Sequence, residues 1–178
     1  MNPAIQHGHF ELSSGRHTDT YVQTAAYLDS PKKMEQLGKA LAQEWYGPVD
    51  LVASPAVGGI ITGYEVAKQL SVPFVFTERV EGVMTLRRGF TIPPTSKVLI
   101  VEDVVTTGQS ASEVANVILE SGASDVGLMC LTKRYETVPG FDKVFSLFTA
   151  SAPVWESSAC PLCAKDVPLD TPGSRNLG

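Results

Sequence analysis

The residues best suited to chemistry lie in one short segment, "VLIVEDVVTTGQS" (98–110). Four apolar residues lead into two adjacent acids, Glu102 and Asp103. Seven residues follow them, two apolar and five small or polar: Val104, Val105, Thr106, Thr107, Gly108, Gln109 and Ser110. Hydroxyl groups and the N–H groups of a helix start bind phosphate, and glycine lets a backbone approach closely. Carboxylates repel phosphate, so the acids need sugar hydroxyls, a cation or both. The segment predicts a ligand with a phosphate and a ribose.

A second interpretation of the same segment is structural. The acids could end a strand and merely cap the following helix, because a motif as short as Asp-Thr-Thr-Gly also occurs by chance. The complete thirteen-residue pattern is more specific than those four residues. The chain has neither the G-x-G-x-x-G of dinucleotide sites nor the G-x-x-x-x-G-K-[ST] of P-loops.

Strands and helices alternate along the rest of the chain. Short apolar runs predict strands at 49–55, 72–78, 97–103, 125–132 and 143–148. Helical spacing predicts helices that begin at Ser30 and Pro31, at Gly58 and at Gln109. Apolar strands separated by helices indicate an α/β fold, a doubly wound and mostly parallel sheet with helices on both faces. Ligands bind at the carboxyl ends of strands in such sheets, which is where the acid pair is expected.

Three segments lie outside this alternation, and we expect all of them to belong to one domain, 1–178. Residues 8–28 begin with alternating apolar and polar residues, which predicts a hairpin. Residues 79–96 form a long excursion that carries Arg79, Arg87 and Arg88, and such loops are often lids. Residues 153–178 contain several prolines and are expected to form an irregular strap.

Composition excludes several classes of protein. The 178 residues are 43% hydrophobic and 19% charged, which is ordinary for a globular domain. A net charge of −5 argues against a nucleic-acid partner, because such binding relies on basic residues. Three cysteines do not make a secreted disulfide scaffold, and we find no membrane-spanning run and no signal peptide. We therefore expect a cytoplasmic protein without a membrane partner.

The thirteen-residue pattern resembles the signature of the type I phosphoribosyltransferases. Other stretches resemble the orotate phosphoribosyltransferases within that family: "GHFELSSGRHTDTYVQ", "ASPAVGGIITG", "LTKRYE" and the tail "CPLC…VPL…PGSR". The resemblance covers nearly the whole chain. It implies transfer of phosphoribose from phosphoribosyl pyrophosphate to orotate, which gives orotidine monophosphate and pyrophosphate. It also implies substrate-bound Mg²⁺ and a homodimer.

The resemblance also implies roles for individual residues. The 5-phosphate would lie on Thr106–Ser110 next to Val104 and Val105, and the ribose on the catalytic residues Glu102 and Asp103. Pyrophosphate would contact Val57 and Gly58, with the 79–96 lid closing over it through its three arginines. The predicted orotate-binding residues, partly in a base-binding hood at 8–28, are Arg134, Thr106, Ser13 and Tyr21.

Some positions depart from the family pattern. Lys133 stands where the family has Asp, and residues 79–96 contain neither the Lys nor the His of the usual lid. Two alternatives therefore remain open. The chain could be a phosphoribosyltransferase for another base, or a non-catalytic nucleotide-sensing regulatory paralogue.

Cys160 and Cys163 form a single C-x-x-C motif near the carboxyl terminus. A structural zinc site needs four ligands, and the other candidates by type are Cys130, His7, His9 and His17. Their positions in the sequence match no recognisable zinc spacing. The sequence therefore predicts a packed turn at these cysteines and no bound metal.

Overall fold

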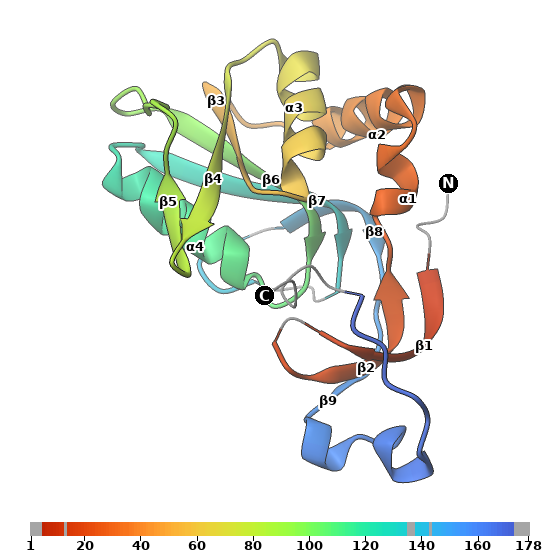
Figure 1. The fold of residues 1–178 in the computed structure, drawn as a ribbon. Coiled ribbons are helices and arrows are strands. Elements are labelled where there is room, and N and C mark those ends of the chain that lie inside the picture. The colour runs from red at the N-terminus through yellow and green to blue at the C-terminus, as the bar shows by residue number, and fades with distance from the viewer. Residues whose placement is uncertain (1–4, 13, 135–137, 143, 173–178) are drawn as a thin grey trace. The chain divides into compact units, whose positions relative to one another are not determined.

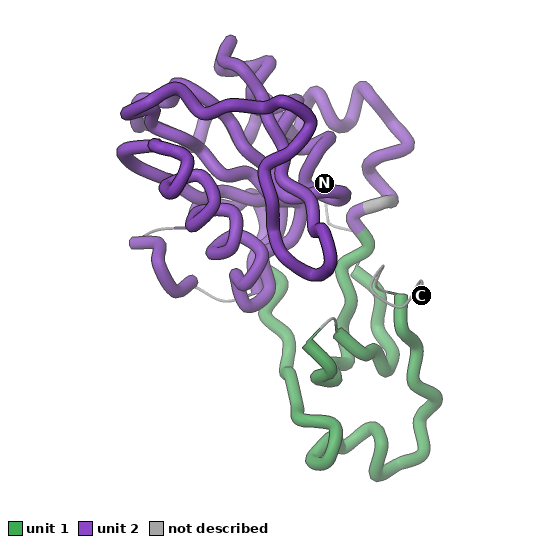
Figure 2. Tube along the Cα trace, turned by 60° about the vertical axis from the view of Figure 1, so that its left-hand side comes forward, with its two compact units in different colours: residues 1–23, 150–178 green, residues 24–149 purple. Residues whose placement is uncertain are grey.

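The computed structural model describes residues 5–12, 14–134, 138–142 and 144–172. The chain divides into two compact units (Figure 2). Residues 24–149 form the first, here called the main unit, and residues 1–23 with 150–178 form the second, here called the small unit. The sequence predicts one domain with a hood and a strap, whereas in the structure the amino-terminal hairpin and the tail share one unit.

The main unit contains a six-stranded sheet (Figure 1). Its strands are β3 (Leu51–Pro55), β4 (Phe74–Val80), β5 (Val83–Leu86), β6 (Lys97–Val105), β7 (Asp125–Lys133) and β8 (Val144–Thr149). They lie in the order β5-β4-β3-β6-β7-β8, and all neighbours are parallel except β4 and β5. The predicted mostly parallel sheet is confirmed.

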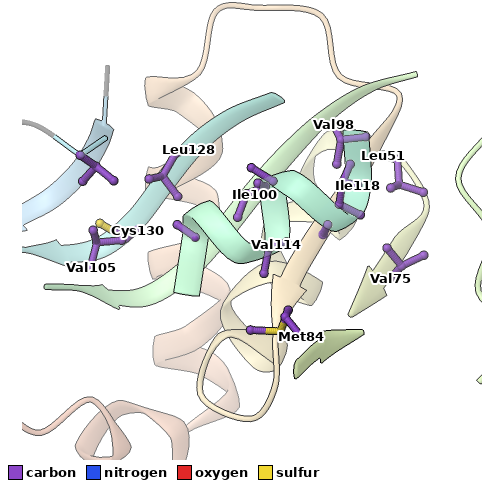
Figure 3. Packing of buried hydrophobic residues seen from close by; sticks show 14 of the residues in the cluster. Leu51, Val75, Met84, Val98, Ile100, Val105, Val114, Ile118, Leu128 and Cys130 are labelled. Carbon is purple, nitrogen blue, oxygen red and sulfur yellow. The ribbon is translucent and has the colours of Figure 1, made fainter. Parts of the chain in front are cut away.

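Both faces of this sheet are buried, and side chains alternate between them along each strand. Figure 3 shows Val98, Ile100, Leu128 and Cys130 with Val114 and Ile118 in the core on the α4 side. The intervening residues Leu99, Val101, Met129 and Leu131 pack in a second core. Alternation with both faces covered explains why the strands are nearly continuous apolar runs.

Helices cover these two faces. They are α1 (Ala25–Leu28), α2 (Pro31–Glu44), α3 (Gly59–Leu70) and α4 (Gln109–Glu120). The second core contains residues of α2 and α3, and the first contains residues of α4. Ser30 caps α2 by accepting a 3.4 Å hydrogen bond from the Lys33 N–H, with Pro31 at the first helical position, as the sequence predicts. No helix in the described part of the chain could cross a membrane.

The 79–96 segment begins as a hairpin. Strand β4 turns at Glu81 and Gly82, both with positive φ, into the antiparallel strand β5. Beyond β5, Ile92 is buried in the α4-side core, and Phe90 packs against that core. The predicted excursion is therefore attached to the core by its own apolar residues.

The small unit contains a three-stranded antiparallel sheet. Its strands are β1 (Ile5–Glu11), β2 (His17–Val22) and β9 (Val154–Trp155), in the order β1-β2-β9. The tail continues through two short 3-10 helices, η1 (Ser157–Ala159) and η2 (Cys163–Lys165). Asp170 then exchanges backbone hydrogen bonds of 2.8 Å with Glu11 and His9. The described tail is thus not simply an irregular strap, because it satisfies free backbone groups at the edges of the hairpin.

Candidate functional site

The acid pair lies inside β6 rather than after it. Val104 pairs with Thr132 and Val105 with Lys133, so the strand continues for two residues beyond Asp103. The prediction that the strand ends on the acids is therefore wrong. The reason is that the neighbouring strand β7 extends equally far and supplies backbone partners that a single-strand pattern does not show.

Because consecutive residues of a strand point to opposite faces, Glu102 and Asp103 have different surroundings. Glu102 follows Val98 and Ile100 in the alternation and faces the α4 side, where Arg79 and Glu113 act on its charge. Asp103 follows Leu99 and Val101 on the side of α2 and α3. The two carboxyl groups are thus presented on different sides of the same strand.

Glu102 is strongly perturbed. It is 6% exposed, and its Oε1 has no hydrogen-bond partner among the described residues. Burial, followed by the charge of Asp103, raises the pKa of Glu102 to about 8, and Arg79 opposes the shift. At neutral pH this carboxyl group is mostly protonated in the protein without a ligand. A buried, perturbed acid beside a loop is typical of a functional site.

Asp103 is half-buried and held by a residue from the start of the main unit. The Thr24 hydroxyl donates a hydrogen bond of 2.7 Å to Asp103 Oδ2. Gly58, which precedes α3, lies against the same carboxylate, since a Cβ at position 58 would be 2.7 Å from Oδ2. The structure therefore brings the predicted pyrophosphate residue Gly58 to the predicted ribose residue Asp103. Its neighbour Val57 is 82% exposed.

The predicted phosphate-binding segment is a three-residue loop, 106–108, followed directly by α4. Gly108 has a φ of 79°, and a Cβ there would overlap the Val138 side chain, so glycine is required. Gln109 and Ser110 form the first turn of α4, which contains no acid. The Thr107 hydroxyl accepts one long hydrogen bond of 3.4 Å from the Gln109 N–H. The loop and the helix start present backbone N–H groups suited to an anion.

The three lid arginines are all paired with acids. Arg88 donates two hydrogen bonds, of 3.0 and 2.9 Å, to Glu78, and Arg87 lies 3.5 Å from the same carboxylate. The Arg88 hydrogen bonds lower the pKa of Glu78. Arg79 instead forms an ion pair with Glu113, near the start of α4. The structure thus brings Arg79 near Glu102, and it places Arg87 and Arg88 on Glu78.

The predicted orotate residues are divided between the units. Arg134 directly follows β7 and is 5% exposed, so its side chain is buried rather than solvated. The backbone N–H of Arg134 donates a hydrogen bond of 3.0 Å to the Val105 carbonyl, so Arg134 lies at the same sheet edge as Thr106. Tyr21 belongs to the small unit, where its ring lies 5.6 Å from that of Phe10. Ser13 lies outside the described residues.

Thr24 is the residue of this site that the sequence analysis missed. It lies 79 positions before Asp103, inside the predicted 8–28 hood but just past the motif "GHFELSSGRHTDTYVQ", and no local pattern distinguishes it from other threonines. A cavity of about 560 Å³ lies elsewhere, lined by Trp45, Asp125, Gly127 and Phe145 among others. Asp125 and Gly127 are at the amino end of β7, whereas parallel sheets bind ligands at the carboxyl ends. We therefore exclude this cavity as the substrate site.

Comparison with known proteins agrees with this geometry. The sequence profile of the Phosphoribosyl transferase domain family matches residues 23–158. A protein of Chlorobium phaeobacteroides (strain BS1) named orotate phosphoribosyltransferase is 44% identical over 176 residues, 98% of this chain and 91% of the relative. One of Thermoanaerobacter sp. (strain X514) with the same name is also 44% identical, over 97% of this chain and 92% of the relative. The crystal structure of orotate phosphoribosyltransferase from Aeropyrum pernix superimposes with a TM-score of 0.64 at 25% identity, covering 82% of this chain and 88% of that one.

Proposed function

This chain belongs to the phosphoribosyltransferase family, and we propose that it transfers phosphoribose from phosphoribosyl pyrophosphate to orotate, giving orotidine monophosphate and pyrophosphate. The observation that carries the proposal is the position of Asp103. Its carboxylate lies in the strand that leads into the phosphate-binding loop, between Thr24 and Gly58. An anchored phosphate at one end and a carboxylate for the sugar at the other match a phosphoribosyl group.

The reaction breaks the bond between the anomeric carbon and pyrophosphate, so positive charge develops on the ribose ring. Asp103 stabilises that charge, and the Thr24 hydroxyl fixes the orientation of the carboxylate. Residues 106–110 hold the 5-phosphate through backbone N–H groups and hydroxyls. With the phosphate fixed, the ribose is held in position for attack by the base. Arg134 recognises the carboxylate of orotate by a charge-assisted hydrogen bond.

Substrate-bound Mg²⁺ fits the residues that are present. Glu102 Oε1 is buried without a hydrogen-bond partner in the described part of the chain, and carboxylate oxygens are the ligands that this hard cation prefers. Glu102, once ionised, would hold the ion directly or through its water, whereas Asp103 on the other side of the strand would face the ribose. When bound, Mg²⁺ neutralises charge on the leaving pyrophosphate.

The lid arginines have to exchange partners when substrate binds. Arg87 and Arg88 would leave Glu78 for the pyrophosphate, whose higher charge makes it the stronger acceptor. Glu113 and the pyrophosphate would compete for Arg79. This exchange supports closing of the lid and exclusion of water from the reacting sugar.

Two further properties belong to the proposal. We infer a homodimer from the family resemblance, with the lid serving the partner's active site. We infer a cytoplasmic location because all three cysteines are unpaired thiols, as expected in a reducing compartment.

A turnover assay tests the proposal. The purified protein is given phosphoribosyl pyrophosphate and Mg²⁺ with orotate, uracil, adenine or hypoxanthine in turn, and pyrophosphate release is measured. We expect release with orotate at a rate at least tenfold above that with the other bases, about 1.4 kcal/mol of discrimination. If another base gives faster pyrophosphate release than orotate, that base is the substrate and orotate is not. Ligand binding without any turnover would instead support a regulatory paralogue.

A further inference from the structure

Four side chains that can bind a metal converge in the small unit. They are His9 of β1, His17 at the start of β2, and Cys160 and Cys163 of the tail. One ligand atom from each lies within 4.8 Å of all the others. Eight residues separate the two histidines, but more than 140 residues separate them from the cysteines, so no spacing motif in the sequence connects the four.

Four of the six distances between these atoms are known individually, and they are close to the edges of a tetrahedron around a zinc ion. His9 Nε2 lies 3.0 Å from His17 Nδ1, and Cys163 Sγ lies 3.3 Å from His17 Nδ1. His9 Nε2 is 3.5 Å from Cys160 Sγ and 3.7 Å from Cys163 Sγ. Zinc bonds of about 2.0–2.1 Å to nitrogen and about 2.3 Å to sulfur place tetrahedral ligands roughly 3.3 to 3.8 Å apart. All four measured distances fall in or close to that range.

The hydrogen bond at the other side of the His9 ring fixes which nitrogen faces the cluster. His9 Nδ1 lies 2.8 Å from the Val167 carbonyl, which can only accept, so Nδ1 carries the proton. Nε2 then faces His17, Cys160 and Cys163. Its one lone pair cannot accept from all three groups, whereas one metal ion can bind all four. A backbone carbonyl on the second ring nitrogen is also the usual support of a metal-bound histidine.

The small unit has little else to stabilise it. Both hydrophobic core clusters consist of main-unit residues. Among the described residues of the small unit, the buried hydrophobics are Phe10, Val22, Ala150 and Cys160. A unit of this size with so small a core usually needs a disulfide or a metal, and the two cysteines are not bonded to each other.

We propose that His9, His17, Cys160 and Cys163 bind one structural Zn²⁺ ion that holds the tail to the amino-terminal hairpin. Two thiolates and two neutral imidazoles form a closed tetrahedral site, in which the thiols release two protons on binding and no position is left for a substrate. Thiolate and imidazole ligands in this geometry select zinc among the common divalent ions. The sequence analysis predicts no metal here, and the converging geometry replaces that interpretation.

Metal content gives the first test and does not depend on enzymatic activity. The full chain is purified without chelators or affinity metals, and zinc is measured by inductively coupled plasma mass spectrometry. We expect about one zinc per chain in the wild type and less than about a tenth of that in Cys160→Ser/Cys163→Ser. A matched pair uses His17→Gln, which should lose zinc, and His7→Gln, an exposed histidine of the same hairpin, which should keep it.

Cobalt substitution gives a second test that needs no mutant. Co²⁺ added to the zinc-stripped wild type should give the strong visible absorption of tetrahedral cobalt with thiolate ligands, and excess Zn²⁺ should abolish it. Stripping the zinc should also lower the thermal midpoint, and re-addition should restore it. A wild type that contains no zinc and takes up neither ion would overturn the proposal, as would a Cys160–Cys163 disulfide in the freshly purified protein.

Discussion

The hydroxyl of Thr24 donates a hydrogen bond of 2.7 Å to Asp103 Oδ2, across 79 positions of sequence. It leaves the other carboxylate oxygen, Oδ1, for a ligand, on a side chain that is only half-buried. This contact connects the first residue of the main unit to the middle of the predicted signature. The orientation of the proposed catalytic carboxylate thus depends on a residue far outside that signature.

Thr24→Val should test whether this orientation matters. The substitution keeps the shape and removes the hydroxyl, and a hydrogen bond to a charged group contributes about 1.5–3 kcal/mol. We expect turnover to fall roughly ten- to 150-fold, with KM for phosphoribosyl pyrophosphate changed less. Thr24→Ser keeps the hydroxyl and is the matched control. If the valine variant turns over as fast as the serine variant, the hydrogen bond has no part in catalysis.

The raised pKa of Glu102 predicts a pH-dependent stability. In the folded protein this pKa is about 8 against 4.5 normally, so between these values the folded state binds a proton that the unfolded state releases. Stability therefore falls as pH rises through this window and levels off above pH 8. Glu102→Gln removes the titration. The free energy of unfolding of Glu102→Gln relative to wild type should therefore increase from pH 5 to pH 9, by an amount on the order of a few kcal/mol. The thermal midpoints of the two proteins should follow the same trend.

The exposed Glu44→Gln serves as control for the Glu102 measurement and should show no such trend. The same pKa predicts that Mg²⁺ with phosphoribosyl pyrophosphate binds more tightly as pH rises toward 8, because a cation prefers the ionised carboxylate. A stability difference between Glu102→Gln and wild type that is constant with pH would contradict the buried, protonated state.

The lid arginines should matter for substrate and little for the fold. Arg87→Ala/Arg88→Ala removes two exposed side chains whose partner is Glu78, and exposed ion pairs contribute about 0–1 kcal/mol each. We expect weaker binding of phosphoribosyl pyrophosphate or slower turnover by about tenfold or more, with a thermal midpoint within a few degrees of wild type. Lys32→Ala/Lys33→Ala makes the same charge change on exposed residues of α2. Equal kinetics in the two double mutants would remove the lid from the mechanism.

Arg134 should set selectivity for an acidic base. Losing a charge-assisted contact to a carboxylate in a desolvated site costs roughly 2–5 kcal/mol. Arg134→Ala should therefore raise KM for orotate far more than KM for phosphoribosyl pyrophosphate. Because Arg134 is buried, some loss of thermal stability is expected as well, and only the ratio of the two KM values tests recognition. Equal effects on both substrates would assign base recognition to another residue.

The elements that the sequence predicts correctly are those specified locally. The helix starts at Ser30–Pro31 and at Gln109 follow from neighbouring residues, and both appear as predicted. The parallel sheet follows from strands that are apolar on both faces. The family signature likewise locates the loop between β6 and α4, because the signature consists of consecutive residues.

What the sequence did not predict depends on contacts between distant segments. The length of β6 beyond Asp103 requires β7, and the role of Thr24 requires the folded main unit. The four-residue cluster of the small unit requires the tail to return to the hairpin, which β9 and Asp170 bring about. None of these contacts leaves a periodicity or a spacing in a single sequence.

Asp103→Asn tests the central claim most directly. Asparagine preserves size and can still accept the Thr24 hydrogen bond, but it lacks the charge that should stabilise a cationic ribose more than the ground state.

The measurement is orotate turnover together with the dissociation constant for phosphoribosyl pyrophosphate and the thermal midpoint. The control is Ser112→Ala on α4, which removes a 3.1 Å hydrogen bond from the Ser112 hydroxyl to the Pro139 carbonyl and should change turnover little. We predict that Asp103→Asn lowers turnover by at least roughly tenfold, about 1.4 kcal/mol, with a smaller change in binding and a retained fold. A folded Asp103→Asn enzyme with full activity would contradict the ribose-facing role, and an unfolded one would show that Asp103 serves the structure instead.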